Sequence, residues 1–231
     1  ELTMELPNLW EAHRAALELA PDRIVATALA LDAALEEGGS VRERLALTGL
    51  ATRSATEPRD LARAHLARAV VLLRMARAEE AGGDLSEARA AVRRLVEPAL
   101  LARIENRDAA RLAEQGAREE AATVARSALE LASAIGDRFE QALAHGTLGQ
   151  LAAVARDLPT AERHHRAMRT LADELVREGV LSREAALGAG AALTEPSRIN
   201  TTGYDDETVL SYFREIAFDT ELGESVDAIR K

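Results

Sequence analysis

The sequence predicts an all-α fold in which helical hairpins stack side by side as an α-solenoid. Hydrophobic residues make up 47% of the 231 residues and aromatic residues only 3%. A core made mostly of Ala and Leu suits closely packed helices better than a β-sandwich. A pair of residues that recurs along the chain also supports a helical array. The first residue of the pair is Gly, or Arg in its place, and the second stands five positions later and is in most cases Ala. The pairs are Gly39 and Arg44, Gly83 and Ala88, Gly116 and Ala121, and Arg156 and Ala161. Their second members lie about 33–44 residues apart, a spacing typical of helical repeats.

Caps, prolines and glycines set the boundaries of the predicted helices. Helix starts are marked by N-cap residues, by Pro in the first turn, or by a capping box. In chain order these are Asn8, Pro21, Ser40 with Glu43, Pro58, Asp84 with Glu87, Pro98 and Pro159. Glycines mark helix ends, and the pair Gly82-Gly83 predicts a hairpin turn. We therefore expect helices over 8–20, 21–38, 41–53, 58–81, 84–96, 98–116, 117–135, 138–155, 159–178 and, as a terminal cap, 182–193.

The composition of the chain changes after Leu193. We predict N-terminal helices over 1–39, helical repeats with their cap over 40–193, a linker over 194–203 and an acidic segment over 204–231. The last segment holds four of the six aromatic residues, Tyr204, Tyr212, Phe213 and Phe218. It is either a latch that packs on the array or the first helix of a further domain, and the change in composition favours the second.

Charge and cysteine content exclude several functional classes. The formal net charge is −10 and the isoelectric point about 5.1, so we expect no direct nucleic-acid partner. The chain has no Cys, which rules out disulfides, thiolate metal sites and a cysteine nucleophile. No apolar run is long enough for a membrane span. We expect a cytoplasmic protein that does not bind membranes.

The hairpin over 142–175 resembles a tetratricopeptide repeat. Numbered from Ala142, it places Leu148-Gly149 at the seventh and eighth positions and Ala161 at the twentieth, where that family has small residues because its two helices cross there. The same numbering gives two earlier pairs at the eighth and twentieth positions, Ala76 with Ala88 and Ala109 with Ala121. The resemblance covers about residues 40–193 and implies a right-handed superhelix. The long second helix ending near Ile135 resembles variant repeats of bacterial signalling proteins.

A second, shorter resemblance lies near the N-terminus. Residues 5–20 are similar to the segment that opens the helical-repeat half of bacterial STAND-type regulators, through Glu5, Asn8, Leu9, Trp10 and Ala12. The resemblance implies the sensor half of a larger regulator. The chain departs from that family because it contains neither a G-x-x-x-x-G-K-[ST] phosphate loop nor an evident helix-turn-helix.

No residue pattern indicates catalysis, a cofactor or a metal. The adjacent His164 and His165 point about 100° apart on a helix and cannot easily share one ion, so we expect His145 and His165 to be interior packing residues. Gly188-Ala-Gly190 lacks the strand and third glycine of a dinucleotide site. Asp205-Asp206-Glu207 is best interpreted as a helix cap.

What remains is a surface for binding. In tetratricopeptide repeats the first helix of each hairpin lines a concave groove, and here the resemblance places Arg77, Arg103, Asn106 and Gln150 in it. Amides can bond a peptide backbone, and Arg can hold carboxylates with two parallel hydrogen bonds. We predict a partner-binding groove for an extended peptide, with no catalytic residues.

The predicted function is a non-enzymatic scaffold that binds a protein or peptide, as the interaction module of a larger bacterial regulatory protein. One alternative is an accessory domain of an enzyme whose catalytic domain begins near residue 204. Another is a receptor for a signal peptide or small ligand. The sequence does not assign an oligomeric state.

Overall fold

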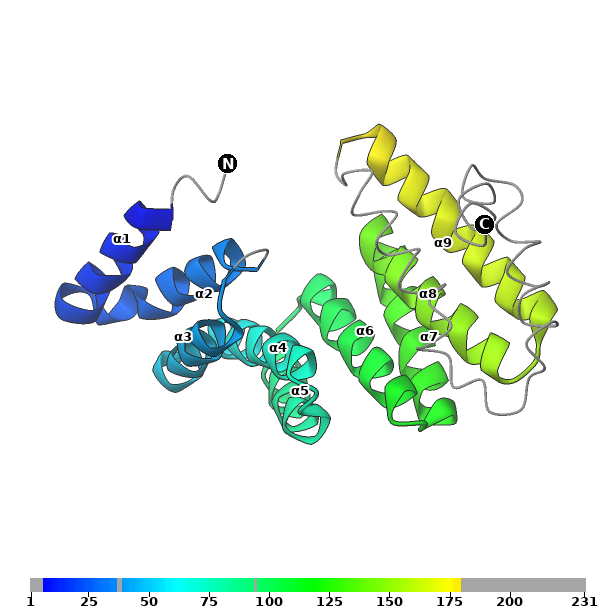
Figure 1. The fold of residues 1–231 in the computed structure, drawn as a ribbon, viewed down its shortest axis with the longest axis horizontal. Helices are drawn as coiled ribbons and strands as arrows, with labels where there is room; N and C mark the ends of the chain where they lie inside the picture. The colour runs from blue at the N-terminus through cyan, green and yellow to red at the C-terminus, as the bar shows by residue number, and fades with distance from the viewer. Residues whose placement is uncertain (1–5, 37–38, 94, 180–231) are drawn as a thin grey trace, which may run out of the picture. The chain divides into compact units, whose positions relative to one another are not determined.

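The described part of the chain is built of helices and turns. A computed structural model describes residues 6–36, 39–93 and 95–179 (Figure 1). It divides into two compact units, over residues 1–144 and 145–231, with the boundary inside one helix. Each unit is considered by itself below. No helix in the described part is long and apolar enough to cross a membrane.

The helices follow one another along the chain with short turns between them. In the described ranges they are α1 (Leu6–Leu19), the 3-10 turn η2 (Pro21–Arg23), α2 (Ile24–Ala34), α3 (Val41–Ser54), α4 (Pro58–Arg74), α5 (Ala78–Val92), α6 (Pro98–Glu114), α7 (Arg118–Ile135), α8 (Arg138–Val154) and α9 (Leu158–Arg177). From α1 to α7 each helix contacts the next (Figure 1). The predicted all-α array is therefore confirmed, whereas the handedness of its superhelix stays a prediction.

The hairpins repeat at a constant interval along the chain. Helices α4, α6 and α8 begin at residues 58, 98 and 138, and their partners α5, α7 and α9 begin at 78, 118 and 158. The turn of each hairpin contains one residue with a positive φ: Ala76 at 57°, Gly116 at 80° and Arg156 at 61°. The residue after each donates its N–H to the carbonyl five residues earlier, which closes the helix end in the same way.

A fully buried alanine lies five residues after each of these turns, namely Ala81, Ala121 and Ala161. In the hairpin of α4 and α5, Ala81 belongs to the same core cluster as Ala69 and Leu72 of α4. Two helices pack at an axis separation of about 8–10 Å only if the side chains between them are small enough. Alanine thus fixes the crossing, and the turn fixes its distance along the chain.

The predicted turn at Gly82-Gly83 is wrong. Both glycines lie inside α5, and the preceding helix ends at Arg74 rather than at Ala81. The pair formed by Gly83 and Ala88 is therefore replaced by Ala76 and Ala81. Gly82 has a packing reason for its lack of a side chain, because a Cβ there would lie 3.2 Å from the Arg111 guanidinium carbon.

The hairpin of α2 and α3 keeps the pattern with one change at the crossing. Helix α2 ends at Ala34 and α4 ends at Arg74, so their ends are separated by the same interval as the hairpins. The turn between α2 and α3 is three residues longer than the turn between α4 and α5. Arg44 thereby takes the place of the crossing alanine. It pairs with Asp32 of α2, with Nε–Oδ1 at 2.8 Å and the two side chains 3% and 9% exposed. A buried ion pair replaces the apolar crossing in this hairpin.

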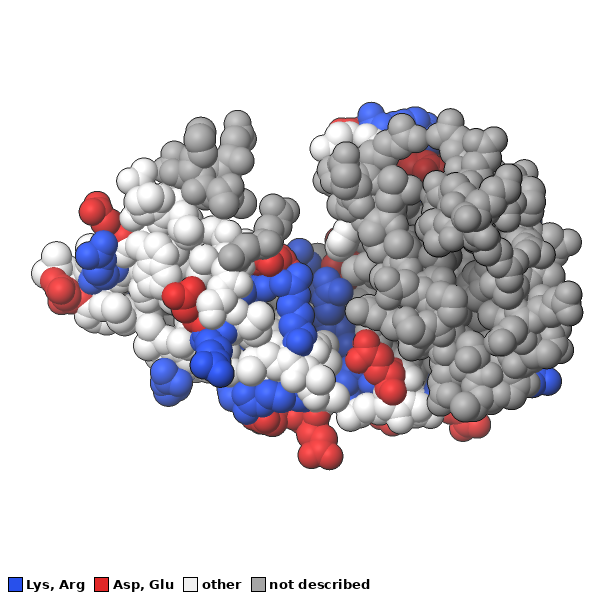
Figure 2. Space-filling view, in the orientation of Figure 1, with Lys and Arg blue, Asp and Glu red and all other residues white. Residues whose placement is uncertain are grey.

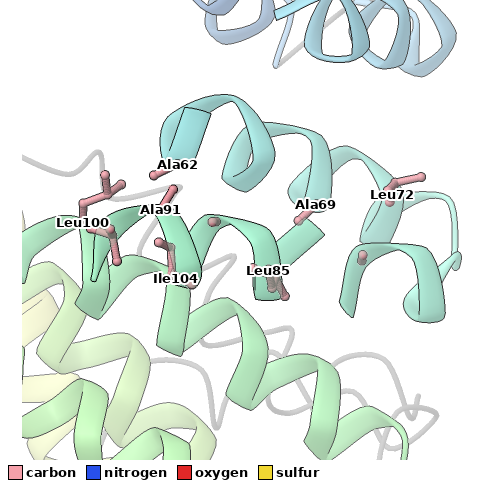
Figure 3. Close-up of a cluster of buried hydrophobic side chains, with 10 residues drawn as sticks. Ala62, Ala69, Leu72, Leu85, Ala91, Leu100 and Ile104 are labelled. Atoms are coloured by element: carbon pink, nitrogen blue, oxygen red, sulfur yellow. The ribbon is translucent and has the colours of Figure 1, made fainter. Parts of the chain in front are cut away.

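The core of the first unit is made of small and aliphatic side chains. One cluster joins three successive helices, and Figure 3 labels its residues Ala62, Ala69, Leu72, Leu85, Ala91, Leu100 and Ile104. The first helices also contact one another directly, α2 with α4 and α4 with α6. Helices α2, α4 and α6 therefore form one layer of the first unit.

Three capping predictions also need correction, and several others lie beyond the described residues. Asn8, expected as an N-cap, lies inside α1, which begins at Leu6. Ser40 is the N-cap of α3 as expected, but its side chain makes no capping hydrogen bond. Asp84 lies inside α5 and caps nothing. The predicted cap helix over 182–193, the linker over 194–203, the segment over 204–231 and residues 188–190 and 205–207 lie outside the described residues.

Two glycine substitutions distinguish a helical Gly83 from one in a turn. A Cβ at Gly83 or at Gly116 would meet nothing within 4 Å, but only Gly116 has a positive φ. We expect Gly83→Ala to stabilise the fold by about 1 kcal/mol, the helix-interior difference between Gly and Ala. Gly116→Ala should destabilise it by about 1 kcal/mol through strain at positive φ. Urea unfolding measures both, and destabilisation by Gly83→Ala would show that the turn lies at the glycines.

Candidate partner-binding surface

The structure places Arg77 in a turn, away from the face of a first helix where we expected it. It lies between the end of α4 and the start of α5. Its Nε and Nη2 atoms donate to Glu80 Oε1 and Oε2, both at 2.6 Å. This pair is half-exposed and spans one helical turn of α5. Arg77 therefore serves as a local partner of Glu80 in this structure.

Arg103 and Asn106 are brought together on α6, where both contact Glu140 at the start of α8. Asn106 donates one amide hydrogen to the Glu140 carbonyl oxygen at 2.9 Å and the other to Oε2 at 2.8 Å. Arg103 Nε lies 3.4 Å from Glu140 Oε1. Glu140 is 2% and Asn106 4% exposed. Contrary to expectation, the Asn106 amide is a buried anchor for α8, with no hydrogen left for a peptide.

Arg103 itself is presented on the surface, with 61% of its side chain exposed. Gln150, the fourth predicted residue, lies half-buried on α8 within the second compact unit. The predicted residues thus divide into a local turn pair, a buried anchor, a half-buried glutamine and one exposed arginine on a first helix.

The constant interval between hairpins identifies two further arginines that the sequence reasoning missed. Helices α2, α4 and α6 end at residues 34, 74 and 114. Arg23, Arg63 and Arg103 lie at the same separation before these three ends. All three are exposed. Arg63 and Arg103 lie on α4 and α6, which contact each other, and Arg23 is the N-cap of α2, which contacts α4. We call Arg23, Arg63 and Arg103 the arginine row. Correct placement of the α4–α5 turn would have revealed it.

Arg23 and Arg63 differ from Arg59 and Arg74 of α4 because they form no ion pair among the described residues. Arg59 pairs with Glu97 at 2.9 Å and Arg74 with Glu36 at 3.5 Å. Within the described residues, Arg63 has no ion pair or hydrogen bond of its side chain, and neither has Arg23. Figure 2 shows Lys and Arg side chains gathered over the middle of the first unit, where Figure 1 places α3 to α5.

An apolar strip runs beside the arginine row. Residues three and seven positions after each arginine lie on the same helix face. Apart from the buried Asn106, they are Ala26, Ala30, Leu66, Val70 and Ala110, all exposed or half-buried. Side chains of this size let another main chain approach closely. The surface is therefore a line of cations next to a shallow apolar track.

Three histidines meet in the second unit. The Nδ1 atoms of His145 and His164 are 2.8 Å apart, so one ring donates a hydrogen bond to the other. The His165 ring packs on Gly149, where a Cβ would lie 2.4 Å from its Cδ2 atom. Burial lowers the pKa of all three imidazoles, and neighbouring positive charge lowers each further. The expected packing role of His145 and His165 fits this geometry.

The remaining histidines join helices of the first unit. His13 Nδ1 lies 2.8 Å from the Thr27 hydroxyl, and burial lowers the pKa of its imidazole. His65 Nδ1 lies 2.7 Å from Asp84 Oδ1, between α4 and α5. In the ranges that the structure describes, no three potential ligands gather into a metal site. The arginine row and its apolar strip remain the surface best suited to binding.

The burial of Asn106 leads to a stability prediction. Asn106→Ala leaves the buried Glu140 without hydrogen bonds to its backbone carbonyl oxygen and to its side-chain Oε2, and we expect a loss of about 1–3 kcal/mol of unfolding free energy. Arg63→Ala, on the surface of the equivalent helix, should change it by less than about 0.5 kcal/mol. Urea unfolding compares the two. An Asn106→Ala variant as stable as the parent would contradict the anchoring role.

The histidine pKa shifts predict a pH dependence. Because the folded pKa values of His145, His164 and His165 lie below the ordinary value of about 6.5, the unfolded chain binds protons more readily. The contribution of these histidines to the free energy of unfolding is therefore full above about pH 6.5, and it is lost as the pH falls below that value. We expect a lower urea midpoint at pH 5.5 than at pH 7.5, and a smaller difference in a His145→Gln/His164→Gln variant. An equal or higher midpoint at pH 5.5 would contradict this.

No protein-family model matches the chain, and comparison with curated proteins likewise gives no match.

Proposed function

We propose that this chain is a non-enzymatic interaction module that binds an extended peptide segment of a partner protein along the first helices of its array. The observation that carries the proposal is the layer of α2, α4 and α6, which contact one another in order. Equivalent residues of contacting helices form rows, and a row is suited to a ligand that is itself linear.

The corrected repeat positions support a tetratricopeptide-like hairpin. The two small residues of each crossing stand twelve positions apart, as Ala69 with Ala81, Ala109 with Ala121 and Gly149 with Ala161. This is the separation between the eighth and twentieth positions of that repeat. The interval from the start of α4 at residue 58 to that of α6 at residue 98 is longer than the roughly 34 residues typical of the family. We therefore propose a lengthened variant of the repeat, as the long second helices suggested.

The surroundings of the proposed surface favour binding over chemistry. The arginine row stands beside aliphatic side chains, and the buried polar contacts nearby, such as Asn106 with Glu140, join helices to one another. The proposed role as sensor part of a bacterial regulator rests on the similarity of residues 5–20 alone. The alternatives involving residues 204–231 depend on a segment outside the described residues.

A peptide-display selection on the full chain tests this function. We expect a random library of twelve-residue peptides to yield binders that lose at least about tenfold in affinity for Ala26→Trp, which blocks the apolar strip. The matched control is Ala90→Trp, on the exposed face of α5. Both variants should unfold at the parent's urea midpoint, since both sites are exposed. Failure to select any peptide, or an equal loss in both variants, would contradict the proposal.

A further inference from the structure

We propose that the arginine row binds an extended acidic segment that carries a carboxylate at every third residue. This inference rests on the proposed function and adds to it the charge and spacing of the partner. It follows from the equivalent positions of Arg23, Arg63 and Arg103 along the chain, from the absence of ion pairs at the first two, and from the apolar strip beside them.

The spacing follows from the packing of the first helices. Arg63 and Arg103 occupy one repeat position on α4 and α6, and Arg23 occupies the equivalent position at the end of the 3-10 turn η2, directly before α2. Helices α2, α4 and α6 contact one another in order. Axes of contacting helices lie about 10 Å apart, so successive arginines advance by about that distance. A chain in the polyproline II conformation rises about 3.1 Å per residue with three residues per turn, so every third side chain lies on the same face. Three residues of ligand therefore match one step of the row.

The positive charge of the arginine row is opposite in sign to the net charge of the protein. The chain carries a formal net charge of −10, yet Arg23 and Arg63 have no acidic partner within the described residues. Asp60 stands one turn before Arg63 on α4 but is not within ion-pair distance of it. Unpaired guanidinium groups in a largely acidic protein supply a local site for anions, and their planar donors suit carboxylates.

Arg103 shows how the row can reach a carboxylate. It approaches Glu140 through Nε at 3.4 Å while 61% of its side chain stays exposed. Its outer guanidinium edge therefore faces solvent. The row ends with this helix, because the equivalent residue of α8 is Leu143. Three carboxylates are thus the complement that the first unit can hold.

The apolar strip favours a peptide over other polyanions. Ala26, Ala30 and Ala110 present little more than a methyl group each, so a peptide backbone can lie against the helices while its acidic side chains reach the arginines. The strip offers no aromatic side chain on which a nucleobase could stack.

The test compares two fluorescein-labelled peptides of identical composition with the full chain by fluorescence anisotropy. One has the sequence Ser-Glu-Ser-Ser-Glu-Ser-Ser-Glu-Ser, and the other has its three glutamates adjacent. We expect the spaced peptide to bind several-fold more tightly than the clustered one. The variant Arg23→Gln/Arg63→Gln/Arg103→Gln should weaken it at least about tenfold, through loss of three charge-assisted contacts.

The matched control is Arg53→Gln/Arg93→Gln/Arg126→Gln, which removes the same charge from exposed positions on or directly after the second helices α3, α5 and α7. It should leave binding of the spaced peptide within about twofold. Equal weakening by both triple variants, or equal affinity for both peptides, would overturn the proposal. So would tighter, row-dependent binding of an oligothymidine strand.

Failure of this inference is distinguishable from failure of the proposed function. If display selects neutral peptides that Ala26→Trp excludes while the spaced acidic peptide does not bind, the acidic partner is wrong and the peptide-binding surface stands. If display selects no peptide and the spaced acidic peptide does not bind either, both the proposed function and this inference are wrong. Because Arg103→Gln removes the cation beside the buried Glu140 carboxylate, the folding control is the double variant Arg23→Gln/Arg63→Gln. Both of its side chains are exposed, so its urea midpoint is expected to match that of the parent. Weaker binding of the spaced peptide by this double variant therefore does not reflect unfolding.

Discussion

The close crossing of two helices at a buried alanine is the constraint on which the rest of the structure depends. Ala81, Ala121 and Ala161 are fully buried, and each follows a positive-φ turn residue by five positions. Because the distance from turn to crossing is constant, successive hairpins present equivalent residues at equivalent places. The arginine row is one consequence of that regularity. The exception at Arg44 keeps the crossing by pairing the guanidinium with Asp32.

Much of the fold could be predicted because the relevant signals are local. Helices α6 to α9 begin and end within two residues of their predicted bounds, since proline lies in the first turn of α6 and of α9, and glycine follows α7. The α4–α5 turn could not be found in this way. Ala76 adopts a positive φ that normally indicates glycine, and Gly82 and Gly83 lie inside α5, where glycine is disfavoured. Neither position follows from local residue preferences.

The candidate surface was predicted in part for the same reason. Arg103 lies on the correct helix face because the α6–α7 turn was placed correctly at Gly116. Arg77 was assigned to the groove only because its hairpin was shifted by seven residues, which also hid Arg63. The burial of Asn106 could not be read from sequence, since its partner Glu140 is 34 residues away. An error at one turn thus propagates to every residue numbered from it.

The backbone conformation of the three hairpin turns tests the central claim, the even repeat of the hairpins, most directly. NMR chemical shifts and scalar couplings of Ala76, Gly83, Gly116 and Arg156 report φ without perturbing the chain. The account predicts left-handed values at Ala76, Gly116 and Arg156, and helical values at Gly83. A left-handed Gly83 with a helical Ala76 would contradict it, because the hairpins would then no longer be evenly spaced and the arginines would not form a row.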